Sequence, residues 1–175
     1  MDRLANLLGA QALALTDRIH TAGPRSVTEM AASERAVLVT LLAHPDQSVS
    51  WLGGVLDISS SGITRVLDRL VAAGWVTRDK GLDARSRQVR LTRAGQRHAR
   101  AILRARRAAL SSALDRLSPD DRGELERLLT LVVGGLAETR EPAIRLCRLC
   151  DRAACASAGR ACPLQHTVTP VGADG

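Results

Sequence analysis

The stretch SSSGITRVLDRLVAAGWVTRDKGLDARSRQVRLTRAG, residues 59–95, decides the fold that this sequence predicts. Its first half repeats apolar residues as one face of a helix does, at Ile63, Val66, Leu67, Leu70 and Val71. Serines precede this stripe and Gly74 follows it, and these residue types are typical of a helix start and a helix end. The second half alternates apolar with polar residues around a charged tip that contains glycine, so it predicts a two-stranded β-hairpin.

Further helices are predicted upstream of this stretch. Leucine and isoleucine recur at helical spacing near the N-terminus, and a Gly-Pro pair at 23–24 ends that helix. Ser26 or Thr28 can cap a second helix that Pro45 stops, and Ser48 or Ser50 can open a third. In chain order these helices cover residues 3–20, 27–44 and 50–57. Short helices followed by a hairpin describe a winged helix-turn-helix, a mainly α fold with an α+β wing.

Long helices are predicted after the hairpin, over residues 93–117 and 120–138, and Pro142 ends the second. Their apolar positions exceed what a small wing domain can cover: Ile102, Leu103, Leu110, Leu114, Leu125, Leu128, Leu129, Leu131 and Val132. Dimerisation is the simplest use for them, and an αα-hairpin that packs on its own domain is the alternative. The predicted organisation is an N-terminal dimerisation helix (3–22), a DNA-binding domain (26–92), C-terminal dimerisation helices (93–141), a cysteine segment (142–166) and a disordered tail (167–175).

Composition narrows the class of protein. The net charge of +7 favours an anionic partner, either nucleic acid or an acidic membrane surface. The first ten residues lack the apolar run of a signal peptide, and no stretch approaches the roughly 20 apolar residues of a membrane span. We therefore expect a cytoplasmic protein outside the membrane, in a compartment where thiols stay reduced unless a metal holds them.

The last helix of the winged unit and the hairpin carry the candidate DNA contacts. The first turns of a recognition helix need small or hydrogen-bonding side chains, because they come closest to base edges in the major groove. A wing needs cations that reach phosphates or the minor groove. Taken singly, the serines can be helix caps and the arginines a solvated surface, but together they favour DNA binding. The candidates are Ser59, Ser60, Ser61, Thr64, Arg65 and Arg69 on the helix, and Arg78, Lys80, Arg85 and Arg87 on the wing.

At these residues the sequence resembles the multiple antibiotic resistance regulator (MarR) family. The matching positions are Asp83-x-Arg85, Leu91-Thr92 and Gly95 in the wing signature, and Leu70, Gly74 and Trp75 at the end of the recognition helix. The resemblance is specific over residues 59–95 and extends by element order over residues 3–140. It implies an obligate homodimer, built from the first helix and the last two, that binds a pseudo-palindromic operator in double-stranded DNA. It also implies that Arg85 enters the minor groove and that Asp83 orients it, whereas Ser86 stands where the wing often has a second acidic residue.

All four cysteines lie in CRLCDRAACASAGRACP, residues 147–163, with the spacing C-x2-C-x4-C-x6-C. Zinc sites usually combine two separated close pairs, whereas iron–sulfur clusters are commonly held by one short run that starts with C-x2-C and ends with Cys-Pro. The run therefore favours an iron–sulfur cluster, 2Fe-2S or 4Fe-4S, on Cys147, Cys150, Cys155 and Cys162, and zinc is the alternative. Asp151 and His166 are nearby spare ligands that are better explained as ordinary tail residues.

Together these features predict a dimeric transcriptional repressor whose operator affinity depends on the cluster, in response to oxidants, nitric oxide or iron supply. The predicted route runs through the dimer arm, because two recognition helices must lie about 34 Å apart to engage both half-sites. The alternative is a regulator with structural zinc at the cysteines and a small aromatic ligand as effector. An enzyme is not expected, because the sequence contains neither an H-x-E pairing nor HExxH and its histidines are scattered.

Overall fold

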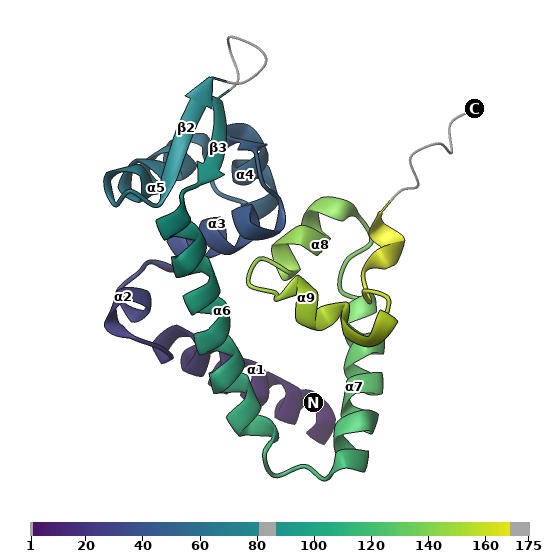
Figure 1. Cartoon of the computed structure of the whole chain (residues 1–175). Coiled ribbons are helices and arrows are strands. Elements are labelled where there is room, and N and C mark those ends of the chain that lie inside the picture. The colour runs from purple at the N-terminus through teal and green to yellow at the C-terminus, as the bar shows by residue number, and fades with distance from the viewer. Residues whose placement is uncertain (1, 81–86, 169–175) are drawn as a thin grey trace, which may run out of the picture.

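A computed structural model describes residues 2–80 and 87–168, which are mainly helical with one small antiparallel sheet (Figure 1). The first part contains α1 (Arg3–Thr21), α2 (Arg25–Thr28), α3 (Ala32–Ala43), β1 (Gln47–Ser48), α4 (Val49–Leu56) and α5 (Ser60–Ala72). The second part contains β2 (Val76–Lys80), β3 (Arg87–Leu91), α6 (Arg93–Leu114), α7 (Pro119–Gly134), α8 (Arg140–Leu146), α9 (Arg152–Cys155) and the 3-10 turns η1 (Ser157–Gly159) and η2 (Gln165–Thr167). The predicted winged helix-turn-helix is confirmed.

The core of the winged unit is aliphatic. Helices α3, α4 and α5 and the sheet contribute its largest fully buried side chains, which include Leu38, Leu41, Leu52, Ile63, Leu67 and Leu70. Trp75 packs against this core at its edge, and its ring stacks on His98 with the ring centroids 4.2 Å apart. The core therefore relies on many branched side chains, each of which stabilises the fold by about 1.5–3 kcal/mol when fully buried.

The recognition helix α5 starts and ends where its sequence dictates. The Ser59 hydroxyl accepts a hydrogen bond from the amide of Gly62 at 3.2 Å, which satisfies one of the exposed donors of the first turn. Ile63, Val66, Leu67 and Leu70 are buried, as the predicted stripe requires, whereas Val71, also predicted in the stripe, is 42% exposed because it lies at the edge of the apolar face. Gly74 adopts φ of +70°, a left-handed conformation that glycine accepts without strain. The helix thus presents its polar face outward.

The sheet has one more strand than predicted. Strand order is β1-β3-β2, with both pairings antiparallel, so β1 lies beside β3 rather than leaving a two-stranded hairpin. Gln47 pairs with Val89 and Ser48 with Gln88. Two residues are too few to display the alternation that marks a strand, and Ser48 also caps α4 by accepting from the Trp51 amide. These two roles explain why the sequence pattern did not predict β1.

The helix predicted over residues 27–44 is wrong as a single element, because the chain forms α2 and α3 with a break between them. Helix α3 starts after Ala31, whose amide donates to the Glu34 carboxylate at 3.0 Å. Val27 and Met30 are both buried at this break, so the chain turns there to place them in the core. Neither Ser26 nor Thr28 caps the long helix that the sequence predicted.

Helices α1, α6 and α7 form the arms outside the winged unit. Figure 1 shows α6 running from the wing to a bend, after which α7 returns at an angle, and α1 packs beside α6. Helix α7 starts at the predicted Ser118-Pro119 cap but ends at Gly134, four residues before the predicted end at 138. Many leucines on α1 and α7 face solvent, for example Leu4 at 75% and Leu131 at 65% exposure. None of the helices within 2–80 and 87–168 is long and apolar enough to cross a membrane.

Helix α8 starts the C-terminal segment and corrects the prediction made from Pro142. Pro142 does not mark the end of helical structure, because it lies in the first turn of α8, where the missing amide costs no hydrogen bond. Helix α8 packs against α4 of the winged unit, and α9 follows it in the space between α3 and α7 (Figure 1). The predicted tail starts too early, since Thr167 is buried and belongs to η2. The remaining tail, 169–175, lies outside the described residues.

Candidate nucleic-acid interface and cysteine site

The N-terminal turns of α5 present a cluster of exposed polar side chains. Ser60, Ser61, Thr64 and Arg65 are all exposed. The Thr64 hydroxyl donates to the Ser60 carbonyl at 2.8 Å, and Arg65 Nε donates to the Ser61 carbonyl at 3.3 Å. These local bonds hold the side chains along the helix surface while their remaining donors and acceptors stay accessible to a ligand.

Two of the predicted contact residues are engaged inside the winged unit. Arg69 Nε lies 2.5 Å from Glu34 Oε1 of α3. Arg78 of β2 donates through Nη1 to Asp68 at 2.8 Å and through Nη2 to the Thr64 carbonyl at 3.0 Å, and only 19% of its side chain is exposed. Both arginines therefore fix α5 against its neighbours, and Arg78 in particular fastens the wing to the recognition helix.

The wing tip carries the rest of the predicted cations. Lys80 and Arg87 pair as the last residues of the described hairpin. Asp83 and Arg85 belong to residues 81–86 and lie outside the described residues. The minor-groove role that the resemblance implies for Arg85 stays a prediction.

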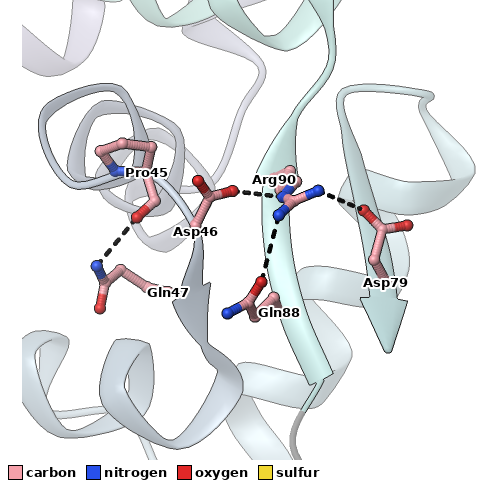
Figure 2. A network of polar contacts seen from close by, with 6 residues as sticks. All are labelled: Pro45, Asp46, Gln47, Asp79, Gln88 and Arg90. Carbon is pink, nitrogen blue, oxygen red and sulfur yellow. Dashed lines mark hydrogen bonds and ion pairs between the residues drawn. The ribbon is translucent and has the colours of Figure 1, made fainter. Parts of the chain in front are cut away.

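Arg90 organises a polar network at the base of the wing, as Figure 2 shows. Its guanidinium contacts Asp46 before β1, Asp79 on β2 at 3.6 Å and Gln88 Oε1 at 3.4 Å. Asp46 has φ of 59°, a left-handed conformation that aspartate tolerates better than most residues. The sequence prediction did not include Arg90, although its place between Val89 and Leu91 on an exposed strand face marks it as a cross-strand partner.

The wing joins the arm α6 through a tight backbone contact. The Thr92 hydroxyl donates to the Gly74 carbonyl at 2.8 Å and accepts from the Gly95 amide at 3.0 Å, so it caps α6 and ties it to the turn after α5. A Cβ atom on Gly95 would lie 2.0 Å from the Trp75 carbonyl oxygen. Only glycine permits this approach, which explains why the matching position in the wing signature carries it.

The structure brings the cysteines to one place. All four line a cavity of about 540 Å³ against α7, and all four also line a neighbouring cavity of about 420 Å³ against the end of α3. Cys147, Cys150 and Cys162 are partly buried, whereas Cys155 is exposed. Among the described residues no group of three or more His, Cys, Asp and Glu side chains is gathered as a site for a metal ion.

The thiols interact as two neighbouring pairs. A hydrogen bond from the Cys147 thiol lowers the pKa of Cys150 to about 6, against the opposing effect of burial, and the positive charges of Arg106 and Arg148 act in the same direction. The same hydrogen bond raises the pKa of Cys147. Burial raises the pKa of Cys155, and neighbouring Cys162 adds to that effect. Among Cys147, Cys150 and Cys155, only Cys150 has its pKa lowered.

Basic residues surround the cavity against α3, and the described part of its lining contains no carboxylate. Arg140, Arg152 and Arg160 line it together with His44, whose pKa is lowered by burial and then by Arg152 and Arg140. The two spare ligands have other partners. Asp151 caps α9 by accepting from the amides of Ala153 and Ala154, and the His166 ring bonds the Ala137 carbonyl at 2.9 Å.

The four cysteines can be compared with what a zinc ion and an iron–sulfur cluster each require of their ligands. A single tetrahedral zinc ion requires its thiolates about 2.3 Å from one point, and no ligand group of this kind was found among residues 2–80 and 87–168. Four thiols around one cavity, with cations and small side chains such as Ala154 and Ala161 in its lining, fit a larger anionic group with several thiolate attachment points. Thiolates of this kind are ligands that either an iron–sulfur cluster or a zinc ion can use.

The fold and its polar helix define a winged helix-turn-helix protein. Residues 19–86 match the sequence model of the MarR family. A MarR family protein from Bacillus stearothermophilus is 25% identical with a TM-score of 0.62, over 72% of this chain and 87% of that one. The winged unit is therefore similar to the MarR family over residues 19–86, and the described chain shares its fold with a MarR family protein.

More distant structures share the fold. Streptococcus pneumoniae FabT, solved in complex with DNA, is 20% identical with a TM-score of 0.60, over 74% of this chain and 92% of that one. Bordetella bronchiseptica BpsR, whose DNA binding is regulated by 6-hydroxynicotinic acid, is 20% identical with a TM-score of 0.56, over 73% of this chain and 96% of that one. No curated protein matches this chain.

Proposed function

We propose that this chain is a DNA-binding transcriptional repressor that acts as a homodimer and whose operator affinity is controlled by an iron–sulfur cluster on Cys147, Cys150, Cys155 and Cys162. The observation that carries the DNA-binding part is the exposed polar N-terminus of α5 on a winged-helix frame. FabT, which has the same fold, was solved bound to DNA.

Some of the predicted residues would contact DNA, and others hold the recognition helix in position. Ser60, Ser61, Thr64 and Arg65 are the exposed groups that would reach base edges and adjacent phosphates in the major groove. Arg69 and Arg78 instead hold α5 against α3 and the wing through Glu34 and Asp68. The predicted contacts of Lys80, Arg85 and Arg87 would add the sequence-independent phosphate and minor-groove attraction.

The exposed leucines of α1 and α7 support the homodimer. Leu4, Leu7, Leu8 and Leu13 on α1 and Leu128, Leu131, Val132 and Leu136 on or after α7 are exposed, and α1 buries none of its residues against the described part of its own chain. An isolated helix gains little stability in water without a packed apolar face. A second copy that covers these two helices would bury them and place two recognition helices on one operator.

The cysteine cavity supports the cluster. Its thiols come from one short run, its cations offset the negative charge that four thiolates bring, and Arg106 and Arg148 already favour ionisation of Cys150. When bound, an iron–sulfur cluster supplies a redox-active centre whose potential depends on its charge, hydrogen bonds and exposure. The four cysteines would hold it between α3 and α7, where Cys155 is open to solvent and therefore to small oxidants.

An apolar cavity wall favours the second candidate, a regulator with structural zinc at the cysteines and a small aromatic effector. Leu114, Leu125, Leu129 and Val133 line the larger cavity opposite the thiols, and its volume of about 540 Å³ falls in the range of small-ligand sites. BpsR responds to a small aromatic acid. In this case the thiols would have to rearrange around one ion.

One preparation of the protein tests both the group held by the cysteines and the binding of DNA. The full chain is purified without oxygen, its visible spectrum is recorded, and iron, sulfide and zinc are measured on the same sample. Matching iron and sulfide with absorbance between about 320 and 550 nm supports the cluster, whereas stoichiometric zinc in a colourless protein supports the alternative. Selection from a random duplex library then tests DNA binding, and recovery of no palindromic site would refute it.

A further inference from the structure

The C-terminal segment docks directly on the winged unit of its own chain. Ile144 of α8 is 7% exposed and belongs to the main core, and Leu149 packs against that core. Arg145 Nη1 lies 2.6 Å from Asp57 Oδ2, and Arg152 Nη1 donates to the Ala43 carbonyl at 3.1 Å. The segment is therefore attached by an apolar anchor flanked by two arginine contacts.

Both arginines contact the C-terminal ends of helices that pack against the recognition helix, Arg152 at α3 and Arg145 at α4. Ala43 is the last residue of α3. Asp57 caps α4 with φ of 54° and is separated from the Ser59 cap of α5 only by Ile58. Because the Asp57 and Ile58 amides bond back to Gly54 and Gly53, the position of Asp57 fixes how the chain enters α5.

The cysteines alternate with these docking residues along the chain. Cys147 follows Arg145 by two positions, and Cys150 precedes Arg152 by two. Two residues span at most about 7 Å of chain, so a rearrangement that shifts the backbone at these cysteines also shifts the backbone that carries Arg145 and Arg152. On its other side the same segment is held to the arm by Arg160, which pairs with Glu126 of α7.

We propose that residues 140–155 clamp the recognition helix of the same chain, through Arg145 on Asp57 and Arg152 on Ala43. The state of the cysteines is then read within one subunit by the α4–α5 turn, rather than by a change in the distance between two subunits. The clamp gives the regulation in the proposed function a route, and to that extent it rests on that proposal. Its presence in the folded chain can be tested whether or not a cluster is bound.

The clamp is tested by comparing two variants. One loses the contacts between the C-terminal segment and the winged unit, and the other loses the contact between that segment and α7. Arg145→Ala with Arg152→Ala releases the winged unit, and the control Arg160→Ala releases α7. Because Arg152 and Arg160 both line the cysteine cavity, each variant also removes one cation from it. The ion pairs are closely matched in exposure, with Arg145 and Asp57 at 53% and 67% and Arg160 and Glu126 at 59% and 54%. Since all three arginines are exposed, both variants should fold.

Amide hydrogen exchange of residues 57–63 in the full chain is the first readout. Exposed ion pairs contribute little each, so the double variant should exchange about 3- to 10-fold faster there, with no change in the control. The second readout is the affinity for a duplex selected by the wild-type chain, before and after loading with iron and sulfide. The ratio of these affinities should fall toward one in the double variant and fall clearly less in the control, because both variants lose one cavity cation but only the double variant loses the clamp.

The possible outcomes separate the clamp from cluster control of DNA binding. Unchanged exchange at 57–63 in the double variant, or equal acceleration in Arg160→Ala, overturns the clamp. Loss of the affinity ratio in Arg160→Ala alone assigns the route to the dimer arm and also overturns it. A wild-type chain whose affinity ignores loading refutes cluster control in the proposed function, while the exchange comparison still decides whether the clamp exists.

Discussion

Replacing Gly95 by alanine tests the junction between the wing and the arm. The added Cβ would lie 2.0 Å from the Trp75 carbonyl oxygen and 3.2 Å from Leu91 Cδ2. That carbonyl accepts from the Thr92 amide at 3.0 Å, so it cannot move away without breaking this hydrogen bond beside the cap of α6. Overpacking of this kind costs about 1–3 kcal/mol, from which the better helix propensity of alanine subtracts about 0.5–1 kcal/mol.

The measurement is thermal unfolding of the full chain, with Gly123→Ala as the matched control. Gly123 lies in α7, and a Cβ atom added there would meet no other described part of the chain within 4 Å, so alanine should stabilise by about 0.5–1 kcal/mol. For a chain of this size each kcal/mol shifts the midpoint by roughly 2–4 °C. Gly95→Ala should therefore lower the midpoint by several degrees, and a midpoint equal to or above the wild-type value would refute the close approach.

Four further predictions rest on named contacts. Ser118→Ala should destabilise the chain by about 1 kcal/mol in urea unfolding, because Ser118 accepts from the Asp121 amide at the start of α7, and unchanged stability would deny that cap. Arg65→Ala should weaken operator binding and reduce the salt slope by about one, while Arg25→Ala, remote from α5, should change neither in the same titrations. Leu131→Asp with Leu128→Asp should shift the sedimentation coefficient from dimer to monomer, and a persistent dimer would exclude α7 from the interface. Because burial and then Arg152 and Arg140 lower the pKa of His44, its unfolded state binds more protons, so stability should fall as pH drops below about 6.5, and His44→Gln should flatten that dependence in pH-dependent unfolding.

Local patterns in the sequence predicted the winged unit well. The Ile63 to Leu70 stripe, the Ser59 cap and Gly74 all lie within one element, so their spacing alone predicts α5. The arm helices were predicted for the same reason, with α6 starting after the Thr92 cap. Strand β1 was missed because two residues carry no periodicity, and α8 was missed because Pro142 in a first turn does not break a helix.

The roles of the arginines depend on contacts that sequence spacing does not reveal. Arg69 reaches Glu34, Arg90 reaches Asp46, and Arg145 reaches Asp57, each across a long stretch of chain. A list of basic residues therefore could not separate Arg65, which is exposed on the reading face, from Arg78, which is held inside the unit. The cysteine run could be proposed as one site from its spacing, but its docking on α3 and α4 required the structure.

The central claim is that the cysteines set the affinity of the winged unit for DNA. The most direct test is an anaerobic binding titration of one selected duplex with the full chain, first loaded with iron and sulfide and then stripped of both, beside a variant with all four cysteines changed to serine. Loading is expected to change the affinity of the wild-type chain at least about tenfold, or 1.4 kcal/mol, and to leave the variant unaffected. Equal affinities for the loaded and stripped wild-type chain would contradict it.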